Sequence, residues 1–411
     1  MLPGARATTF EEKWMARKAQ PRRNAASPRA DGPLIAIRAH DDKKNLIEHF
    51  VPRKAAPIIA GMSMRWGYIL RVRTRWAGDA DMRDYFGNKA IGDLAELGIT
   101  DTAIRQFASV QQIEVELYDR PSAATKADPL LEAASEIPWE YLLSSATRSI
   151  GRFESLLVTR CFSNGTTIKP SKPGTVLFVE SAPGRIDYRF EDEEKRIAAA
   201  VNVDEDKGLE FSRTEPYTRL KDRIARKAWQ AIHVTGVDTH QVAWLIEDFY
   251  TAVVGRAAVA RRAEVIDGSD QLHDGMILRG DYDSELPVRY DELADLLLES
   301  KRPPYVITLN LYYSGARTAR EMVKRGAYAA LGFLDEIDDE FAELFFQAFY
   351  WSWGHDGRSV TEAFLDAWQS MDGDRIYGTS IVIWLGRSMI GQPDRPAKKP
   401  ARAIKRRNGG Q

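Results

Sequence analysis

A short apolar run that follows two prolines constrains the fold of this chain more than any other stretch. Within the stretch Tyr-Val-Ile-Thr-Leu-Asn-Leu-Tyr-Tyr-Ser-Gly at residues 305–315, Val306, Ile307 and Leu309 make an apolar run that is too short for a helix. Such a run is typical of a strand that is buried on both faces of a parallel sheet. Gly315 breaks the pattern, and residues 316–325 have the composition of a helix that ends at Gly326. The stretch therefore predicts a strand followed by a helix in an α/β fold.

The carboxyl end of this strand is where a functional site is expected. In an open α/β sheet, ligands and reactive groups lie just past the carboxyl ends of the strands. Tyr312, Tyr313 and Ser314 occupy that position. These three side chains are therefore the first candidates for function.

The same alternation of short apolar strands and helices recurs along the chain. Strands are expected at residues 155–161, 175–180, 231–235, 275–278, 327–331 and 380–385, and helices at residues 190–203, 218–227, 290–299, 338–351 and 360–371. This alternation predicts a doubly wound, mostly parallel sheet with helices on both faces, which is a three-layer α/β/α sandwich.

The N-terminal part is predicted to be a β-α-α-β extension at an edge of that sheet. Residues 64–76 alternate apolar and arginine side chains, and residues 112–118 alternate apolar and glutamate side chains, as half-buried strands do. Two helices are expected between them, at residues 81–97 and 101–110, and a further strand at residues 34–37. Arginines facing glutamates across the two strands would explain the alternation without any ligand.

Composition limits the classes of function. The 411 residues include one cysteine, Cys161, which excludes an internal disulfide and a cysteine-based zinc cluster. The six histidines are scattered, so we expect neither a metal nor another cofactor. There is no apolar run of membrane-spanning length and no apolar leader. We therefore expect a cytoplasmic protein without a membrane partner.

Charge is segregated between the ends and the middle of the chain. Residues 1–32 carry seven Lys or Arg against three acids, and residues 392–411 carry seven against one. Since the formal net charge is -1, the body between these ends is near -11. Such ends are typical of disordered segments, and nucleic-acid binding through them is the weaker alternative. We expect a disordered segment at 1–32, the extension at 33–120, a core domain at 121–390 and a disordered tail at 391–411.

Several stretches in a consistent order resemble the CHAT family of bacterial caspase-like domains, which is related to caspases and separase. They are Ile-Pro-Trp-Glu-Tyr-Leu at 137–142, Thr-Val-Leu-Phe-Val-Glu-Ser-Ala-Pro-Gly at 175–184, Ala-Ile-His-Val-Thr-Gly-Val-Asp at 231–238, Leu-Asn-Leu-Tyr-Tyr-Ser-Gly at 309–315 and Ser-Val-Thr-Glu-Ala-Phe at 359–364. The resemblance covers roughly residues 110–388. It implies a caspase-like fold, and by analogy a role in bacterial stress or anti-phage defence.

The resemblance also implies that the catalytic pair of the family is lost. Active members use a histidine as general base and a cysteine as the nucleophile that attacks a peptide carbonyl. The matching positions here are Val237 and Tyr312. Valine has no proton to exchange, and a tyrosine hydroxyl with a pKa of about 10 is a poor nucleophile for an amide. We therefore expect a pseudo-protease.

Three other groups could restore chemistry. Cys161 lies inside an expected strand, where a buried and inert thiol is usual. His233 matches the first histidine of the family motif and is expected to be structural. His240 follows Val237 by three residues and could act as a base for Ser314. This displaced serine-type hydrolase is the alternative to a pseudo-protease.

The residues left at the expected site favour binding over cleavage. Tyr312 and Tyr313 supply aromatic rings, and Asp238 and Glu336 supply carboxylates. A groove with this composition suits a basic peptide. We therefore expect a protein-binding module whose partner is an active caspase-like protease or another protein with a basic segment.

Overall fold

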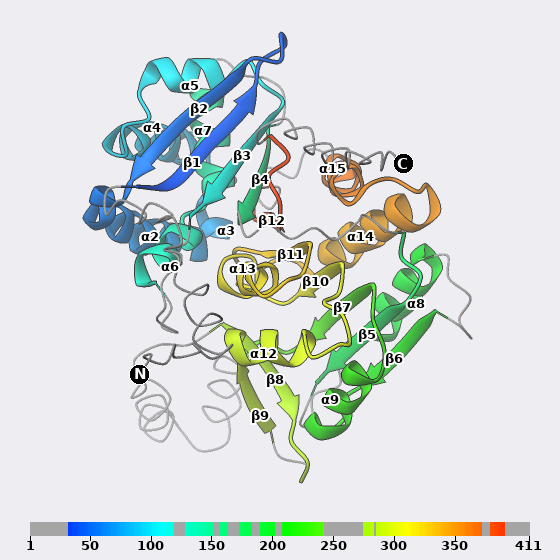
Figure 1. Cartoon of the computed structure of the whole chain (residues 1–411). Coiled ribbons are helices and arrows are strands. Elements are labelled where there is room, and N and C mark those ends of the chain that lie inside the picture. Colours follow the sequence, from blue (N-terminus) through cyan, green and yellow to red (C-terminus); the bar gives the residue numbers. More distant parts are fainter. Residues whose placement is uncertain are drawn as a thin grey trace, which may run out of the picture.

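One large mixed sheet forms the centre of the molecule. The computed structural model describes residues 32–118, 128–150, 156–162, 172–182, 190–201, 208–239, 241, 274–282, 285–371 and 379–390. Within these residues, ten strands form a single sheet in the order β2-β1-β3-β4-β12-β11-β10-β7-β5-β6, and two further strands form a separate hairpin. Helices cover both faces of the sheet (Figure 1). The expected α/β sandwich with a mostly parallel sheet is confirmed.

Five adjacent strands run parallel and form the first block of the sheet. In spatial order they are β6 Leu209–Arg213, β5 Val176–Ser181, β7 Ala231–Gly236, β10 Val306–Asn310 and β11 Ala329–Phe333. Strand β5 pairs with β6 on one side and with β7 on the other. The sheet therefore grows outward in both directions from β5, which creates a topological switch point at the carboxyl ends of β5 and β7.

Three of the remaining strands form a second parallel block that runs the other way. Strand β12 (Ile381–Leu385) is antiparallel to β11 and parallel to β4 (Leu157–Phe162), which is parallel to β3 (Gln112–Leu117). Strands β1 (Pro33–His40) and β2 (Leu46–Pro52) complete this edge in antiparallel pairs. The carboxyl ends of the two parallel blocks consequently lie at opposite edges of the sheet.

Alternation along the strands separates two hydrophobic cores, one on each face. Phe178, Val306 and Phe333 belong to one core, and their neighbours Leu177 and Ile307 belong to the other. The first core is covered by α8 (Phe190–Val201), α14 (Asp339–Tyr350), the π-helical turn η2 (Trp351–His355) and α15 (Val360–Ser370). The second is covered by α9 (Tyr217–Arg226), α12 (Tyr290–Leu297), α13 (Arg317–Lys324) and the N-terminal helices.

The strand predicted at residues 64–76 is wrong, because this segment is helical. It lies in α2 (Ala56–Arg71) and α3 (Arg73–Trp76). Buried side chains occur at helical spacing, at Ile59, Met62 and Trp66, whereas Met64 is 77% exposed. The helical spacing of apolar residues begins before residue 64. The sequence therefore indicates a helix only when residues 56–63 are considered together with residues 64–76.

The expected pairing of arginines with glutamates across that strand is therefore wrong as well. Arg65 instead binds Asp93, with 2.7 Å between Nη2 and Oδ1. Glu116 of β3 is bound by Arg38, from the neighbouring strand β1. Arg65 and Glu116 thus each have a partner of opposite charge, but they do not pair with each other.

The N-terminal extension contains more elements than predicted and is part of the same sheet. Strands β1 and β2 are followed by the 3-10 turn η1 (Arg53–Ala55), α2, α3, α4 (Ala80–Glu96) and α5 (Asp101–Phe107), and then by β3. Most residues of the segments predicted to be disordered, at 1–32 and 391–411, lie outside the described part of the chain. None of the helices in the described part combines the length and the apolar character needed to cross a bilayer.

The Pro-Trp-Glu motif has an architectural role. It joins α6 (Pro129–Glu136) to α7 (Trp139–Ser149). The indole of Trp139 donates to the carbonyl of Ala134 at 3.0 Å. Glu140 accepts from the guanidinium of Arg160, with 2.7 Å between Nε and Oε1, and both side chains are buried. The motif thus fastens the two helices to strand β4.

Candidate functional site

The sequence-predicted site residues gather at the carboxyl edge of the first block. Thr235 of β7 and Asn310 of β10 are register partners near the ends of two adjacent strands. Val237 follows the first strand, and Tyr312 and Tyr313 follow the second. This edge adjoins the switch point at β5, which is the usual place for a ligand in such a sheet.

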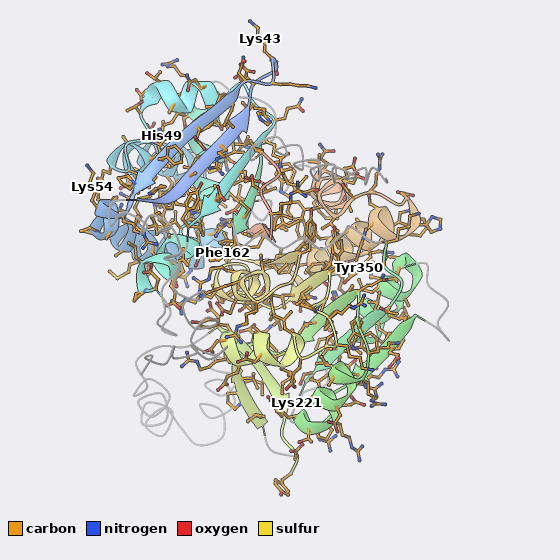
Figure 2. The ribbon with its side chains drawn as sticks, viewed as in Figure 1. Lys43, His49, Lys54, Phe162, Lys221 and Tyr350 are labelled. Carbon is orange, nitrogen blue, oxygen red and sulfur yellow. The ribbon has the colours of Figure 1, made fainter. Side chains whose placement is uncertain are left out.

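A closed hydrogen-bond network lies beneath this edge. His233 is fully buried, with Nδ1 2.7 Å from the hydroxyl of Thr308 and Nε2 2.9 Å from a carboxylate oxygen of Glu193. Thr308 is also 2.7 Å from the hydroxyl of Tyr350, a residue of α14 that is labelled in Figure 2. Asn310 donates to Glu193 at 2.8 Å. Both ring nitrogens of His233 are occupied, which is the arrangement of a structural histidine.

The end of β7 is held by the hairpin of β8 (Gly275–Arg279) and β9 (Glu285–Arg289). The buried Val237 accepts at its carbonyl from the N–H of Ile277 at 2.9 Å. Asp238 is also buried, and its carboxylate accepts from the N–H of Gln241 at 2.9 Å. Gln241 returns the contact, since its side-chain oxygen accepts from the N–H of Asp238 at 3.0 Å. The two residues after β7 are thus fixed in place.

The loop after β10 presents two tyrosine hydroxyls to carboxylates. Tyr313 has a φ of 55°, a left-handed conformation that is uncommon for residues other than glycine. Its hydroxyl lies 3.3 Å from Glu336, and the hydroxyl of Tyr312 lies 3.4 Å from Asp339. Together with Asp238, these four residues form what we call the acidic rim.

The acidic rim makes Tyr312 a weak nucleophile. Partial burial raises the pKa of the Tyr312 hydroxyl well above its usual range, and the nearby carboxylates of Asp339, Asp238 and Glu336 raise it further. Negative charges disfavour the phenolate because it would add another negative charge to the same place. The hydroxyl therefore stays protonated and can only donate or accept hydrogen bonds.

More carboxylates lie behind the acidic rim, where α14 packs beside α8. Partial burial and the charge of Glu193 raise the pKa of Glu343 to about 7, although Arg196 lies 3.2 Å away. Partial burial and the neighbouring Asp338 carboxylate raise the pKa of Asp339. Among the described residues, cations therefore neutralise the negative charge at this edge only in part.

Sequence reasoning missed Asp339, Glu343 and Glu193 as parts of this edge. A signal was present, because both helices begin with acidic first turns and both start near the carboxyl edge of the sheet. What the sequence does not show is that α8 and α14 lie side by side, so that their acids repel one another.

Ser314 is placed as a structural residue. Its side chain is 1% exposed, its hydroxyl donates to the carbonyl of Leu311 at 2.7 Å, and it accepts from the N–H of Phe333 at 3.2 Å. These contacts fasten the turn after β10 to strand β11. A substrate would have to displace them, which disfavours attack by this hydroxyl. His240, the base suggested for the displaced pair, lies outside the described residues.

Cys161 lies far from this edge in the order of the sheet and is also buried. It belongs to β4 in the second block, and burial raises the pKa of its thiol. Its thiol is consequently protonated and shielded from solvent. Within the described part of the chain, no group of three or more His, Cys, Asp or Glu side chains is arranged to hold a metal ion.

No protein-family model and no curated protein matches the chain. The chemistry of the site is therefore inferred from its geometry. Among the described residues at this edge, no accessible nucleophile lies beside a base. What the edge offers instead is carboxylates and phenol hydroxyls, which are suited to holding cationic side chains.

Proposed function

We propose that this chain is a non-cleaving, caspase-like domain that binds a basic segment of a partner protein at the acidic rim. The observation that carries the proposal is the excess of carboxylates around Tyr312 and Tyr313, at the edge where a sheet of this kind holds its ligand. Carboxylates that raise one another's pKa values leave an incomplete charge balance, which a cationic partner would complete.

Binding would use two kinds of contact. Arginine or lysine side chains would donate charge-assisted hydrogen bonds to Asp339 and Glu336. The rings of Tyr312 and Tyr313 would add cation–π contacts at the same positions. A bound cation would also reduce the repulsion between Asp339 and Glu343, so that part of the binding free energy would come from relief of an unfavourable interaction.

The same edge explains why the partner would remain intact. The family resemblance puts Val237 at the position of the base, and valine cannot take a proton. Tyr312 has a raised pKa, and the buried hydroxyl of Ser314 is held by backbone contacts. The resemblance to the CHAT family suggests a setting in bacterial stress signalling or defence. In that setting the partner would be an active caspase-like protease or one of its targets.

The proposal is tested by fluorescence anisotropy with a labelled nine-residue peptide that contains three arginines. We expect saturable binding that Asp339→Asn and Glu336→Gln each weaken by about threefold to tenfold, since each removes a charge-assisted contact. Glu96→Gln is the matched control because it removes an exposed carboxylate at the far end of α4.

Two results would contradict the proposal. One is equal binding by all four proteins, which would make the acidic rim irrelevant. The other is cleavage of the peptide that disappears in Ser314→Ala, which would restore the hydrolase alternative.

A further inference from the structure

The outer side of helix α2 is an exposed apolar surface at the left edge of the molecule in Figure 1. Met64 is 77% exposed and Tyr68 is 73% exposed. These two residues lie one helical turn apart, and the exposed Pro57 and Ala60 continue the same side of the helix. We call these four residues the α2 face. A continuous apolar surface of this kind is typical of an interaction site.

The composition of α2 is that of a helix with neighbours on both sides. Its inner side is fully buried in the N-terminal core, at Ile59, Met62 and Trp66. Arg65 and Arg71 are the only charged residues among its 16. A surface helix normally carries charged and polar side chains on its outer side, whereas a helix that is apolar all round is covered all round. The α2 face therefore has the composition of a surface that another segment covers.

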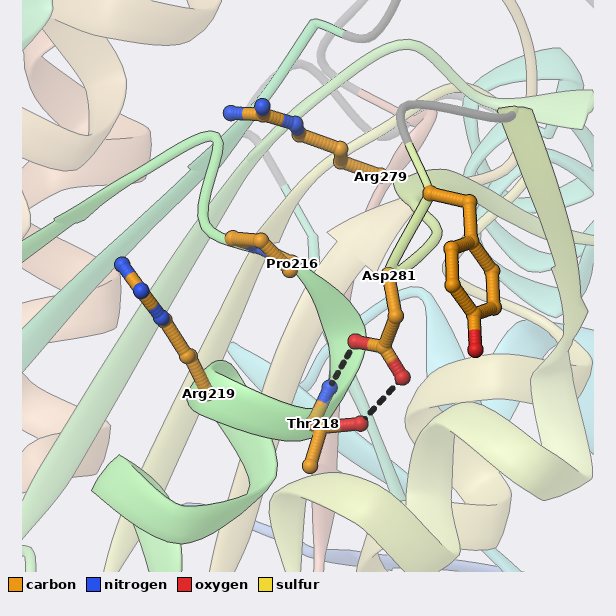
Figure 3. A pocket seen from close by; sticks show the side chains of 6 residues that line it. Pro216, Thr218, Arg219, Arg279 and Asp281 are labelled. Atoms are coloured by element: carbon orange, nitrogen blue, oxygen red, sulfur yellow. Dashed lines mark hydrogen bonds between the residues drawn. The ribbon is translucent and has the colours of Figure 1, made fainter.

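Another exposed tyrosine shows how the α2 face differs from ordinary surface. Tyr282, between β8 and β9, is 95% exposed. It lines a hollow together with the polar side chains of Arg219, Arg279 and Asp281. In this hollow the carboxylate of Asp281 accepts from the N–H of Thr218 at 3.1 Å (Figure 3). A single ring among polar groups is usual at a protein surface, whereas the α2 face joins apolar side chains along several turns of one helix.

The N-terminal end of the chain joins the described fold beside this helix. Pro33, the first residue of β1, is the register partner of Pro52, the last residue of β2. Three residues then lead from Pro52 to the start of α2. Helix α2 is about 24 Å long, and the eleven residues at 21–31 span up to about 35 Å when extended. A segment that precedes Pro21 can therefore reach any part of the α2 face.

The segment before Pro21 has the sequence of a short amphipathic helix. Thr9 and Glu12 have the spacing of a capping box. Phe10 and Trp14 lie one turn apart, which places both rings on one side, and Pro21 ends the pattern. A helix of this length is marginal in water by itself, in agreement with the disorder expected from the composition of this end of the chain. It needs an apolar surface on which to fold.

We propose that residues 9–20 of the same chain fold as a helix on the α2 face. Phe10 and Trp14 pack on Met64 and Tyr68, so that each apolar surface covers the other. The place where the N-terminal end joins the fold favours this occupant, because the short link keeps the segment at a high effective concentration beside α2. A second copy of the chain is the competing occupant. The inference does not depend on the acidic rim, since it uses other residues and apolar contacts.

Hydrogen exchange measured by mass spectrometry tests this contact in the full chain. We expect the backbone amides of residues 9–20 to exchange at least about tenfold more slowly than those of an unstructured segment, because burial of the aromatic rings stabilises the docked helix. The double variant Met64→Gln with Tyr68→Gln should remove this protection, and so should Trp14→Gln. Tyr282→Gln is the matched control, since it removes an exposed tyrosine from another surface. Exchange of the β1 amides verifies that each variant folds.

The outcomes separate the two occupants. Protection that is kept in Tyr282→Gln and lost in the other two variants supports the contact. Fast exchange of residues 9–20 in the unmodified chain would overturn it, and so would protection that survives the double variant on α2. Sedimentation velocity tests the second copy. A dimer that the double variant abolishes and that Trp14→Gln leaves intact would overturn the proposal in favour of contact between two α2 faces.

Discussion

Charged side chains have different neighbours in the two parallel blocks of the sheet. In the second block and the helices around it, carboxylates face arginines across short distances. The pairs are Glu140 with Arg160, Glu116 with Arg38, and Asp93 with Arg65. At the carboxyl edge of the first block, Asp339 and Glu343 lie near other carboxylates and their pKa values are raised, even though Glu343 also contacts Arg196.

This difference suggests two roles for charged residues. Carboxylates paired with arginine support the fold, whereas the unbalanced carboxylates can bind a ligand. Burying a carboxylate with an arginine carries a desolvation penalty that the attraction offsets only in part, but removing one partner is strongly destabilising because the other charge stays buried and unpaired. Carboxylates that repel one another lower stability, although one of them, Glu193, also belongs to the buried network around His233. Under our proposal this unfavourable arrangement persists because a basic partner completes it. Four predictions test the contrast, beginning with the largest expected effect.

The Glu140–Arg160 pair should be the most sensitive charge in the protein. Glu140→Gln leaves Arg160 charged and buried, which should lower the free energy of unfolding by about 3–5 kcal/mol. Urea denaturation measures this loss. Replacing both residues, as Glu140→Leu with Arg160→Met, should recover most of it because no charge remains unpaired. A loss below about 1 kcal/mol in the single variant would contradict the architectural role.

Ser314→Ala should destabilise the protein without affecting any chemistry. The N–H of Phe333 loses its acceptor in a buried place, so we expect a loss of about 1–3 kcal/mol in the free energy of unfolding. Ser109→Ala is the matched control, since its exposed hydroxyl also donates to one backbone carbonyl. Equal stability of the two variants would argue against a structural role for Ser314.

Stability should depend on pH through Glu343. Its pKa is raised from 4.5 to about 7 in the folded protein, so the folded state holds this proton more tightly than the unfolded state. The protonated carboxyl of Glu343 therefore adds fully to the free energy of unfolding below pH 4.5. This contribution is lost as the pH rises from 4.5 to about 7. Because the site is partly exposed, we expect a loss on the order of 1–2 kcal/mol.

Urea midpoints between pH 5 and pH 8 measure this effect in comparison with Glu343→Gln. The variant should lack this component of the pH dependence and should be the more stable of the two at pH 8. If the stability of the two proteins depends on pH in the same way, Glu343 does not cause the pH dependence.

The smallest effect is expected at an exposed ion pair. Lys195 and Asp192 lie 3.2 Å apart on α8, with side chains 73% and 66% exposed. Lys195→Ala should change the free energy of unfolding by no more than about 0.5 kcal/mol, as measured by urea denaturation. A much larger change would mean that burial does not determine which charges support this fold.

Most of the first block could be predicted from sequence because its strands are apolar runs bounded by breakers. The strand that contains the apolar run Val306, Ile307 and Leu309 was predicted, and so was the helix that follows it. Strand β6 was missed because only two of its five residues, Leu209 and Phe211, are apolar, and so short an alternation does not distinguish a strand from irregular structure. Residues 64–76 were predicted as a strand because their large apolar side chains fall at even positions. The helical spacing becomes clear only when the residues before 64 are considered as well.

The candidate site was predictable in part for the same reason. Positions just past strand ends are set by the strands, so Val237, Asp238, Tyr312 and Tyr313 could be placed at one edge from sequence. The contribution of Asp339 and Glu343 could not, because it depends on two helices that pack together across a distance of about 150 residues.

Calorimetry with the arginine peptide at pH 7 tests the central claim most directly. At this pH a carboxyl with a pKa of about 7 is half protonated, and a cation bound nearby lowers that pKa. Titrations in buffers of different ionisation enthalpy should therefore show release of up to about half a proton per bound peptide, and mass spectrometry should recover the peptide intact. Glu343→Gln should bind the peptide with little proton release. Equal release from this variant, or recovery of peptide fragments, would contradict a non-cleaving acidic rim.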